Sequence, residues 1–421
     1  MTDFTKDDVL SYSEANDVRF VRLSFCDIFG QLKNVSIAAS ELGRAFEEGI
    51  RFDASAIRGF LNIEDSDLLL FPEPNTLSSL SPYEGAEGKT IRLFCSILHP
   101  DMKPFEGDAR YLLKSKEQSL LKKGLNMAAG TECEFYLFRL DEEGNPTLNP
   151  MDNAGYLDPS PMDKAENLRA RLSQIMRGMG ITIETSHHEK GPGQNEVSFA
   201  PTSLLEAADD IISFKAALKN LAALSSLYAS FLPKPLFDKP GSGFHISLSC
   251  RRGNESFDTV REHMAAGILN RIKELTLFLN PIANSYDRLG LMEAPSAISW
   301  GTGNRDLLLR MPEMRKGGAK RIEVRSADPS SNPYLALYLL VSAAEKGIEK
   351  KMKLNEIPEN GKLPENLREA VEEAEASAFV KSLLPEHLRS CFIEAKKTDW
   401  KNISASGYPK VTARDTEFPL T

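Results

Sequence analysis

The order of hydrophobic and polar residues predicts a small folded unit at the start of the chain. Apolar and polar residues alternate over residues 18–37, on both sides of the turn-forming sequence DIFG at 27–30, which is typical of a β-hairpin. A short helix is expected at 40–48 and another strand at 91–98. Residues 1–102 are therefore predicted to form a small α+β domain.

A second, larger domain is expected over residues 103–421, and its clearest element is a long strand at 125–140. Glu132 and Glu134 stand two positions apart in this strand, so both side chains point to the same face of a sheet. Charged residues at alternate positions of an apolar strand fit either an edge strand that faces water or a functional site. The pattern alone leaves both interpretations open.

The sequence SHHEKGPGQNEVSF at 186–199 carries two more carboxylates. Alternating residues at 181–184 predict one strand, KGPG at 190–193 predicts a turn, and a returning strand is expected from Glu196. Glu189 would then lie beside Glu196 on neighbouring strands. A solvated hairpin with surface charges is the alternative for this pair.

Two further strands carry polar residues at alternate positions. The glycine-rich sequence KPGSGFHISLSC at 239–250 leads into a strand on which His245 and Ser249 share a face. The sequence RIEVR at 321–325 puts two arginines and a glutamate on one face and two apolar residues on the other. A single histidine on a strand is compatible with a structural role as well as with metal binding.

Helical spacing of apolar residues indicates that most of the remaining chain is α-helical. The apolar run at 334–344 follows a capping sequence and is predicted to be a buried core helix. Residues 364–397 are expected to form a helical bundle, and residues 402–421 to be irregular. Helices are also predicted at 109–123, 164–179, 203–228 and 257–279.

The composition of the chain limits which classes of function and which cellular location are expected. The 421 residues include 51 basic and 60 acidic ones, and the net charge of −9 argues against general nucleic-acid binding. The start of the chain has no basic region followed by an apolar run, and the stretch at 334–344 is too short to span a bilayer, so a cytoplasmic protein without membrane contact is expected. Five cysteines show neither zinc spacing nor an even count, and they are expected to be reduced and buried.

Together the polar positions form a set of six potential metal ligands, five of which offer carboxylate oxygens that suit Mg²⁺ or Mn²⁺ better than zinc. Clustered carboxylates repel one another unless cations offset their charge. Metal ions combined with arginines are typical of sites that catalyse phosphoryl transfer, because both neutralise charge on the transferring oxygens. The potential ligands are Glu132, Glu134, Glu189, Glu196, His245 and Glu323, and the arginines are Arg288, Arg305, Arg310, Arg321 and Arg325.

Eight motifs follow one another along the chain: TECEFYLF (131–138), AGYLD (154–158), SHHEKGPGQNEV (186–197), GSGFHISLS (241–249), NSYDRL (284–289), EAP (293–295), NRDLLLRMP (304–312) and RIEVRSADPSSNPY (321–334). In their order and content they resemble the glutamine synthetase family in its type I, bacterial and archaeal, form. The resemblance implies a β-grasp domain at 1–102 and a catalytic domain at 103–421 whose curved antiparallel sheet forms half a barrel. It also implies a homo-oligomeric ring, a hexamer or a dodecamer, with active sites shared between subunits.

The resemblance further implies that glutamate and ammonium are joined through a γ-glutamyl phosphate, with ATP as co-substrate and two or more Mg²⁺ or Mn²⁺ ions per site. One metal would be held by Glu134, Glu189 and Glu196. The other metal would be held by Glu132, His245 and Glu323. The residues implied for ATP are Ser249, Arg310 and Arg321.

Catalytic roles follow from the same resemblance. Arg305 corresponds to an arginine that stabilises the transition state, and Glu293 to a flap glutamate that shields the intermediate from water. Asp53, reaching from a neighbouring subunit, would complete the ammonium pocket with Tyr156 and Glu189. The residues implied for the glutamate substrate and its phosphate are Gly241, Arg288 and Arg325.

Several positions depart from the family pattern. Ala56 replaces a serine, Pro240 replaces an asparagine before the glycine-rich loop, and the flap at 289–293 is one residue short. These changes keep a ligase for a larger amine as an alternative, and a non-catalytic structural or regulatory relative as a second one. The tail after Trp400 also differs, which leaves the stacking of two rings open.

Overall fold

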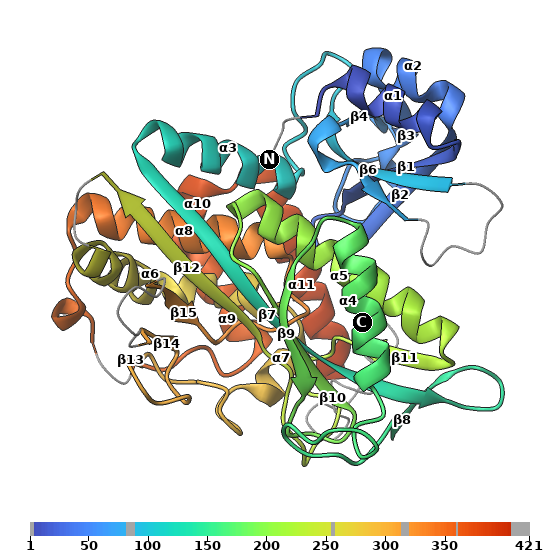
Figure 1. Cartoon of the computed structure of the whole chain (residues 1–421). Helices are drawn as coiled ribbons and strands as arrows, with labels where there is room; N and C mark the ends of the chain where they lie inside the picture. The colour runs from blue at the N-terminus through green and yellow to red at the C-terminus, as the bar shows by residue number, and fades with distance from the viewer. Residues whose placement is uncertain (1–3, 81–88, 254–256, 313–319, 359–360, 406–421) are drawn as a thin grey trace.

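The computed structural model describes residues 4–80, 89–253, 257–312, 320–358 and 361–405, which form two domains, each built on its own sheet (Figure 1). The smaller sheet has the strand order β2-β1-β6-β4-β3, and β5 joins it beside β6. β1 and β6 are parallel, whereas the other pairs are antiparallel. The elements are α1 (Lys6–Ala15), β1 (Val18–Cys26), β2 (Leu32–Ala38), η1 (Ala39–Glu41), α2 (Leu42–Glu48), β3 (Ile50–Asp53), η2 (Ala54–Ala56), β4 (Asp67–Pro72), η3 (Pro74–Thr76), β5 (Ser78–Ser79) and β6 (Lys89–Leu98).

The predicted β-hairpin at the start of the chain is present as β1 and β2. Its turn is stabilised by Asp27, whose carboxylate accepts hydrogen bonds from the backbone N–H of Phe29 (3.0 Å) and of Gln31 (2.9 Å). Val21 and Leu23 are fully buried at alternate positions. The alternation in the sequence therefore reflects one face of β1 packed on the core.

The larger sheet has the order β13-β14-β15-β12-β7-β10-β9, and β8 and β11 also pair with β7. β7 lies inside the sheet, with β10 and β12 antiparallel on its two sides. The interpretation of Glu132 and Glu134 as residues of an edge strand is therefore wrong. The strands are β7 (Leu125–Leu140), β8 (Pro146–Pro150), β9 (Ile183–His188), β10 (Gln194–Phe199), β11 (Leu227–Ser230), β12 (Phe244–Arg252), β13 (Trp300–Gly301), β14 (Leu309–Arg310) and β15 (Ile322–Val324).

Helices pack against this sheet and form the core of the second domain (Figure 1). The helix predicted at 334–344 is longer than expected and is buried over most of its length, because it lies against α3, α5 and α6. The helices are α3 (Ala109–Lys122), α4 (Glu166–Gly178), α5 (Leu204–Leu224), α6 (Phe257–Leu279), α7 (Ala283–Arg288), α8 (Pro333–Lys350), η4 (Leu354–Glu356), α9 (Leu367–Ala376), α10 (Ala378–Leu383) and α11 (Glu386–Ala405).

Several predicted boundaries were wrong, among them the starts of β6 and α4, each by two residues. The helix expected at 203–228 ends at Leu224, since Ser226 turns the chain with a φ of +55° and the apolar run continues as β11. β9 begins at Ile183, two residues later than expected. Residues 402–405 belong to α11 rather than to an irregular tail, and residues 406–421 lie outside the described residues.

The two domains meet at a buried ion network around Arg110, which is 4% exposed. Its guanidinium contacts Glu73 of the small domain at 2.9 Å and Asp209 of α5 at 2.8 Å. Lys114 lies 2.7 Å from Glu73, and the Tyr334 hydroxyl donates to Asp209 at 2.6 Å. Both carboxylates at this junction are thus neutralised by side chains of the protein.

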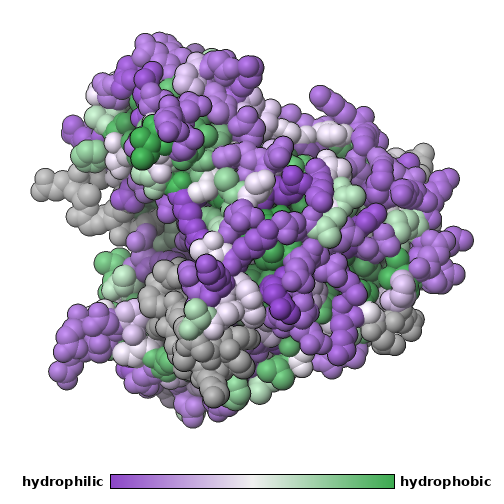
Figure 2. Space-filling view, turned by 180° about the vertical axis from the view of Figure 1, so that it is seen from behind, coloured by the Kyte–Doolittle hydropathy of each residue, from purple (hydrophilic) through white to green (hydrophobic). Residues whose placement is uncertain are grey.

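The face of the molecule in Figure 2 is mainly hydrophilic, with hydrophobic residues in small patches. None of the helices in the described ranges has the length and apolar character needed to cross a membrane. All five cysteines are free thiols, as expected, but Cys391 is only half-buried whereas the other four are buried.

Candidate active site

The register of the larger sheet brings the predicted ligands onto one face. Glu134 of β7 lies directly opposite Glu196 of β10, and Glu132 lies opposite His245 of β12. Glu323 follows on β15, the strand that pairs with β12. Because directly opposite side chains stand about 5 Å apart, strand pairing alone assembles most of the ligand set.

The strand that carries Glu196 is not solvated, although the neighbouring β9 is partly exposed. β10 is buried at every position, and Glu196 is 9% exposed. Gly193 takes a φ of +67° in the turn, and a Cβ on Gly191 would lie 2.1 Å from the hydroxyl of Tyr136, so both positions require glycine. The interpretation of Glu189 and Glu196 as surface charges of a solvated hairpin is therefore wrong, because Glu196 is buried and Glu189 is half-buried.

The ligand atoms gather into three overlapping groups, and within each group they lie within 4.8 Å of one another. One group contains the three residues expected to hold the ATP-side metal. The other expected set is divided, because Glu196 belongs to two groups, one with Glu134 and one with Glu189. The assignment of residues to individual metals thus stays a prediction. The groups are Glu132–His245–Glu323, Glu134–Glu196–His245 and His187–Glu189–Glu196.

The Glu134 side of this face carries more negative charge than its surroundings neutralise. Burial, with a contribution from Glu196 and Glu189 and against the effect of His245, raises the pKa of Glu134 to about 7. Burial and Glu196 also raise the pKa of Glu189. Neighbouring histidines only partly offset this charge, and clustered carboxylate oxygens of this kind suit Mg²⁺ or Mn²⁺. The residues present therefore fit a divalent cation.

Arginines neutralise the Glu323 side of the site. Glu323 is 2% exposed and accepts hydrogen bonds from Arg310 at 2.8 Å and Arg325 at 2.6 Å. Within the described structure, the Nε of Arg310 is buried and has no hydrogen-bond partner. A buried N–H that is left free beside an ion pair can donate to an added anion such as a phosphate.

Glu132 lies between the Glu134 side and the Glu323 side of the site. Burial alone would raise the pKa of Glu132, but His245 at 3.3 Å and the charge of Arg321 lower it to about 2. Arg321 lies at 3.9 Å, and its buried Nε also lacks a partner among the described residues. His245 is thus shared by two carboxylates, since its Nε2 lies 3.8 Å from Glu134.

Arg288 and the glycine-rich loop lie together, as the predicted glutamate site requires. The Arg288 guanidinium is 3% exposed and donates to the backbone oxygens of Ser326 (2.9 Å) and Arg325 (3.2 Å). A Cβ on Gly241 would meet the Cγ of Arg288 at 2.8 Å, and one on Gly243 would meet its Nη2 at 2.8 Å. Glycine at both positions therefore lets the loop approach the arginine.

Three predicted residues are half-buried or exposed. Ser249 is half-buried in β12. Arg305 is exposed, and its backbone oxygen accepts a hydrogen bond from the Nε of Arg325 at 2.9 Å. Glu293 pairs with Lys190, Nζ to Oε1, at 2.5 Å.

The single chain does not complete the predicted ammonium pocket. Asp53 is exposed on the small domain and accepts hydrogen bonds from the backbone N–H (2.9 Å) and hydroxyl (2.7 Å) of Ser55. Tyr156 is 44% exposed, and its ring lies 5.6 Å from that of His187. No interaction among the described residues joins Asp53 to Tyr156 or Glu189.

The sequence predictions missed two histidines that organise β9. His187 lies 3.3 Å from Glu196 and 3.7 Å from Glu189. His188 is buried and lies 2.9 Å from Asp152, which also accepts a backbone N–H of the following turn at 2.9 Å. The signal was present as the HHE sequence, because neighbours of a metal ligand commonly orient it.

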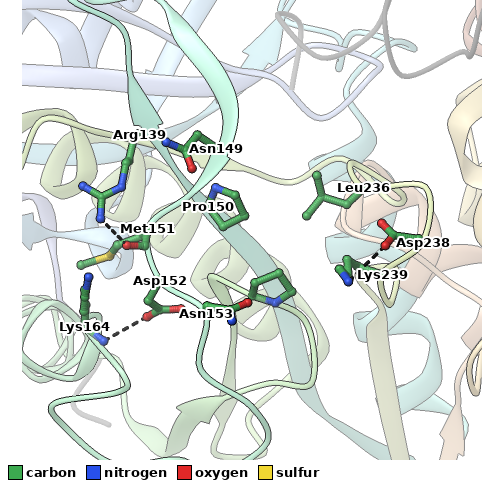
Figure 3. Close-up of a pocket in the computed structure, with 11 residues that line it drawn as sticks. Arg139, Asn149, Pro150, Met151, Asp152, Asn153, Lys164, Leu236, Asp238 and Lys239 are labelled. Carbon is green, nitrogen blue, oxygen red and sulfur yellow. Dashed lines mark hydrogen bonds and ion pairs between the residues drawn. The ribbon is translucent and has the colours of Figure 1, made fainter.

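A pocket of about 540 Å³ opens beside Asp152 (Figure 3), and none of the six ligands is among the described residues that line it. Arg139 there donates to the backbone oxygen of Met151 at 2.7 Å, and Lys239 pairs with Asp238 at 3.1 Å. Because these cations already have partners, the carboxylate face is the better candidate for an active site.

Comparisons with known proteins agree with this geometry. Residues 17–100 match the family model of the glutamine synthetase beta-Grasp domain, and residues 106–412 match that of the glutamine synthetase catalytic domain. The chain is 40% identical to the glutamine synthetase of Methanosarcina mazei, with 96% of both chains covered. It is 39% identical to that of Clostridium saccharobutylicum, with 95% of this chain and 96% of the relative covered. The solved structure of GmaS without ligand has a TM-score of 0.84 at 26% identity, and the match covers 94% of this chain and 96% of that one.

Proposed function

Because the chain belongs to the glutamine synthetase family, we propose that it uses ATP to ligate ammonium to the γ-carboxylate of L-glutamate, through γ-glutamyl phosphate, and releases glutamine. The predicted β-grasp domain and half-barrel sheet are confirmed with the family. The chain is an ATP-dependent ligase, so the alternative of a non-catalytic relative is not kept. The observation that carries the proposal is the adjacency of buried carboxylates, around Glu134 and Glu196, to the arginine-paired Glu323.

Family membership implies ATP and divalent metal ions. We propose two or more Mg²⁺ or Mn²⁺ ions per site, and bound ions would neutralise charge on the carboxylates and on the phosphates. Glu196 of β10 is buried, and Glu132 and Glu134 of β7 are half-buried on the same face of the sheet. The proposed ligands are Glu134, Glu189 and Glu196 for one ion, and Glu132, His245 and Glu323 for another.

The arginines would stabilise the phosphoryl group as it moves from ATP to the γ-carboxylate of glutamate. Arg310 and Arg321 have buried, unpaired Nε atoms in the described structure, and with Ser249 they would bind the ATP phosphates. The exposed guanidinium of Arg305 would reach the phosphoryl group in flight. Arginines already held in place stabilise such charge without reorganisation.

The amino-acid substrate would lie beside Arg288 and Gly241, with Arg325 adding a second positive charge. Arg288 is fixed by its two backbone acceptors, so it can hold a carboxylate in one orientation. In the second half-reaction, the nitrogen of ammonia attacks the acyl carbon and phosphate leaves. A carboxylate near the nucleophile must first take a proton from ammonium, and Asp53 is the proposed base.

We propose that neighbouring subunits share each site in a ring, a hexamer or a dodecamer. Support comes from the position of Asp53, which is exposed on the small domain and has no described interaction with Tyr156 or Glu189. Mixed rings of Asp53→Ala and Glu189→Ala chains should recover activity, because some interfaces pair two intact halves. Inactive rings that demonstrably contain both chains would refute a shared site.

Glutamine formation tests the reaction directly. Purified protein should make glutamine and phosphate from glutamate, ATP and ammonium when Mg²⁺ or Mn²⁺ is present. A larger amine is the second candidate acceptor, and it is favoured by Ala56 and Pro240. Pro240 has no side-chain amide, and its backbone oxygen accepts a hydrogen bond from the Tyr136 hydroxyl at 2.6 Å. Turnover with alkylamines but none with ammonium would replace the first proposal by the second.

The domain limits, the cellular location and the absence of nucleic-acid or membrane partners are further expectations of the same proposal. The domain limits are placed at 1–102 and 103–421, which limited proteolysis can test. The protein is expected in the cytoplasm, without nucleic-acid or membrane partners, and cell fractionation would test this.

A further inference from the structure

Two loops that face each other at the candidate active site are joined by an ion pair. Lys190 lies in the turn after the proposed ligand Glu189, and Glu293 ends the flap at 289–293. The Nζ and Oε1 atoms are 2.5 Å apart, and the two side chains are 45% and 39% exposed. The pair thus links segments that are far apart in sequence on the side where the acceptor amine would enter.

The flap has few interactions of its own to hold its position. Met292 (φ +45°) and Glu293 (φ +68°) adopt left-handed conformations that non-glycine residues rarely take. Leu291 and Met292 are 50% and 56% exposed, so they contribute little apolar burial. The backbone N–H of Gly290 donates to the oxygen of Ala294 at 2.8 Å, which closes the loop on itself rather than on the opposite wall.

Lys190, in contrast, extends from a rigid turn. Its backbone N–H donates to the Glu189 carboxylate at 3.0 Å, and the Glu189 N–H donates to the oxygen of Gln194 at 2.8 Å. The Gly193 N–H is held by the buried Asp152 at 2.9 Å. The ion pair therefore joins a fixed anchor to a loosely held segment, so Lys190 sets the position of Glu293 rather than the reverse.

We propose that Lys190 is a positioning residue that holds Glu293 across the acceptor side and so limits the access of water to the γ-glutamyl phosphate. This inference rests on the proposed function. The Lys190 ammonium, with Arg305 and Arg325 adding to its effect, keeps the pKa of Glu293 below its usual value, so the carboxylate stays charged and the pair stays formed. Lys190 itself does not touch the reacting atoms.

The side reaction that Lys190 limits is hydrolysis of the intermediate. The oxygen of water, instead of the nitrogen of ammonia, attacks the acyl carbon, and the bond from that carbon to the phosphate oxygen breaks. Glutamate and phosphate are released and one water is consumed, with one of its protons passing to the released phosphate and the other to solvent. ATP is then used without glutamine being formed.

The test compares the ratio of phosphate released to glutamine formed in the wild type and in Lys190→Met. The ratio should be near one in the wild type and rise roughly two- to fivefold in Lys190→Met, the range expected for losing one partly exposed ion pair. Lys190→Arg should restore it. Lys346→Met is a matched control, because Lys346 pairs with Glu349 at 3.1 Å at exposures of 47% and 40%, and its ratio should not change.

Two further measurements separate positioning from a general structural effect. If Lys190 acts through Glu293, then Lys190→Met should add little to the ratio already raised by Glu293→Gln. High salt should raise the ratio in the wild type more than in Lys190→Met, because salt screens an exposed pair.

Failure of the inference and failure of the proposed function give different results. A normal ratio in assembled Lys190→Met protein, or in Lys190→Gln if the first variant does not fold, would overturn the role of Lys190. A wild type that makes no glutamine from ammonium would overturn the proposed function. Phosphate release that depends on glutamate, measured without any acceptor, would then still report whether Lys190→Met increases the leak, and equal release in both proteins would overturn the inference.

Discussion

The junction between the two domains and the carboxylate face of the candidate active site both bury glutamates. At the junction, burial alone would raise the pKa of Glu73, but Arg110 and Lys114 outweigh it and lower the pKa to about 2. On the active-site face, burial raises the pKa of Glu134 to about 7, and neighbouring carboxylates reinforce the shift. Arg110 lies 2.9 Å from Glu73.

The difference identifies the charges that the fold neutralises and those that it leaves to a ligand. A buried ionised group without a partner costs several kcal/mol of folding free energy. Within the site itself, Glu323 is neutralised in the same way as Glu73 at the junction, because Arg310 and Arg325 lie 2.8 and 2.6 Å away. The Glu134 side has no such arginine pair in the described structure, so it is the side where a divalent cation is most needed.

Removal of the junction cation should give the largest effect. Arg110→Met leaves Glu73 and Asp209 buried without their shared partner, so the free energy of unfolding should fall by about 3–5 kcal/mol. Denaturant unfolding measures the change. Arg51→Met is the matched control: its pair with Asp67 (2.9 Å) is exposed, and its loss should cost about 0.5 kcal/mol or less. Equal losses in both variants would remove the contrast between buried and exposed pairs.

The junction should also weaken in acid. The pKa of Glu73 is lowered from 4.5 to about 2 in the folded protein, so its stabilising effect is fully present above pH 4.5 and is lost as the pH falls towards 2. The loss across this window should reach about 3 kcal/mol. Unfolding of the wild type and of Glu73→Gln, measured against pH, isolates this contribution. Parallel curves for the two proteins over that window would show that Glu73 is not neutralised by its cations.

Two glutamates on the same strand face should differ in function. Glu132 lies beside His245 and Arg321, so Glu132→Ala should mainly raise the KM for ATP. Glu134 accepts the backbone N–H of Gly243 at 2.9 Å, so Glu134→Ala should mainly raise the KM for glutamate. Each effect should be roughly 10–100-fold, as is typical for residues that support a metal site. Small, identical effects on all kinetic constants would contradict two distinct metal positions.

The sequence was informative wherever short-range patterns decide the structure. Alternation and turn residues predicted the hairpin of β1 and β2, the full length of β7, and the carboxylates that share its face. The end of α5 was missed because the apolar run continues into β11, and a hydrophobic pattern does not mark where a helix gives way to a buried strand.

The charge balance of the site could not be predicted in the same way. Whether Glu132 and Glu134 faced water or a partner depended on which strands flank β7, and strand order is a long-range property. The link between Lys190 and Glu293 joins residues 103 positions apart and depends on two loop conformations. His187 lay within a recognised motif, but its two carboxylate contacts follow only from the pairing of β9 with β10.

The stability of Glu134→Gln, with and without metal, tests most directly whether the active site leaves its charge to a divalent cation. In EDTA the variant should be more stable than the wild type by about 1 kcal/mol, because it removes a buried carboxylate that lacks a cation. In Mn²⁺ the order should reverse, since the wild type gains binding free energy that the variant largely loses. A variant that is less stable than the wild type in EDTA, with both proteins unaffected by Mn²⁺, would contradict the account.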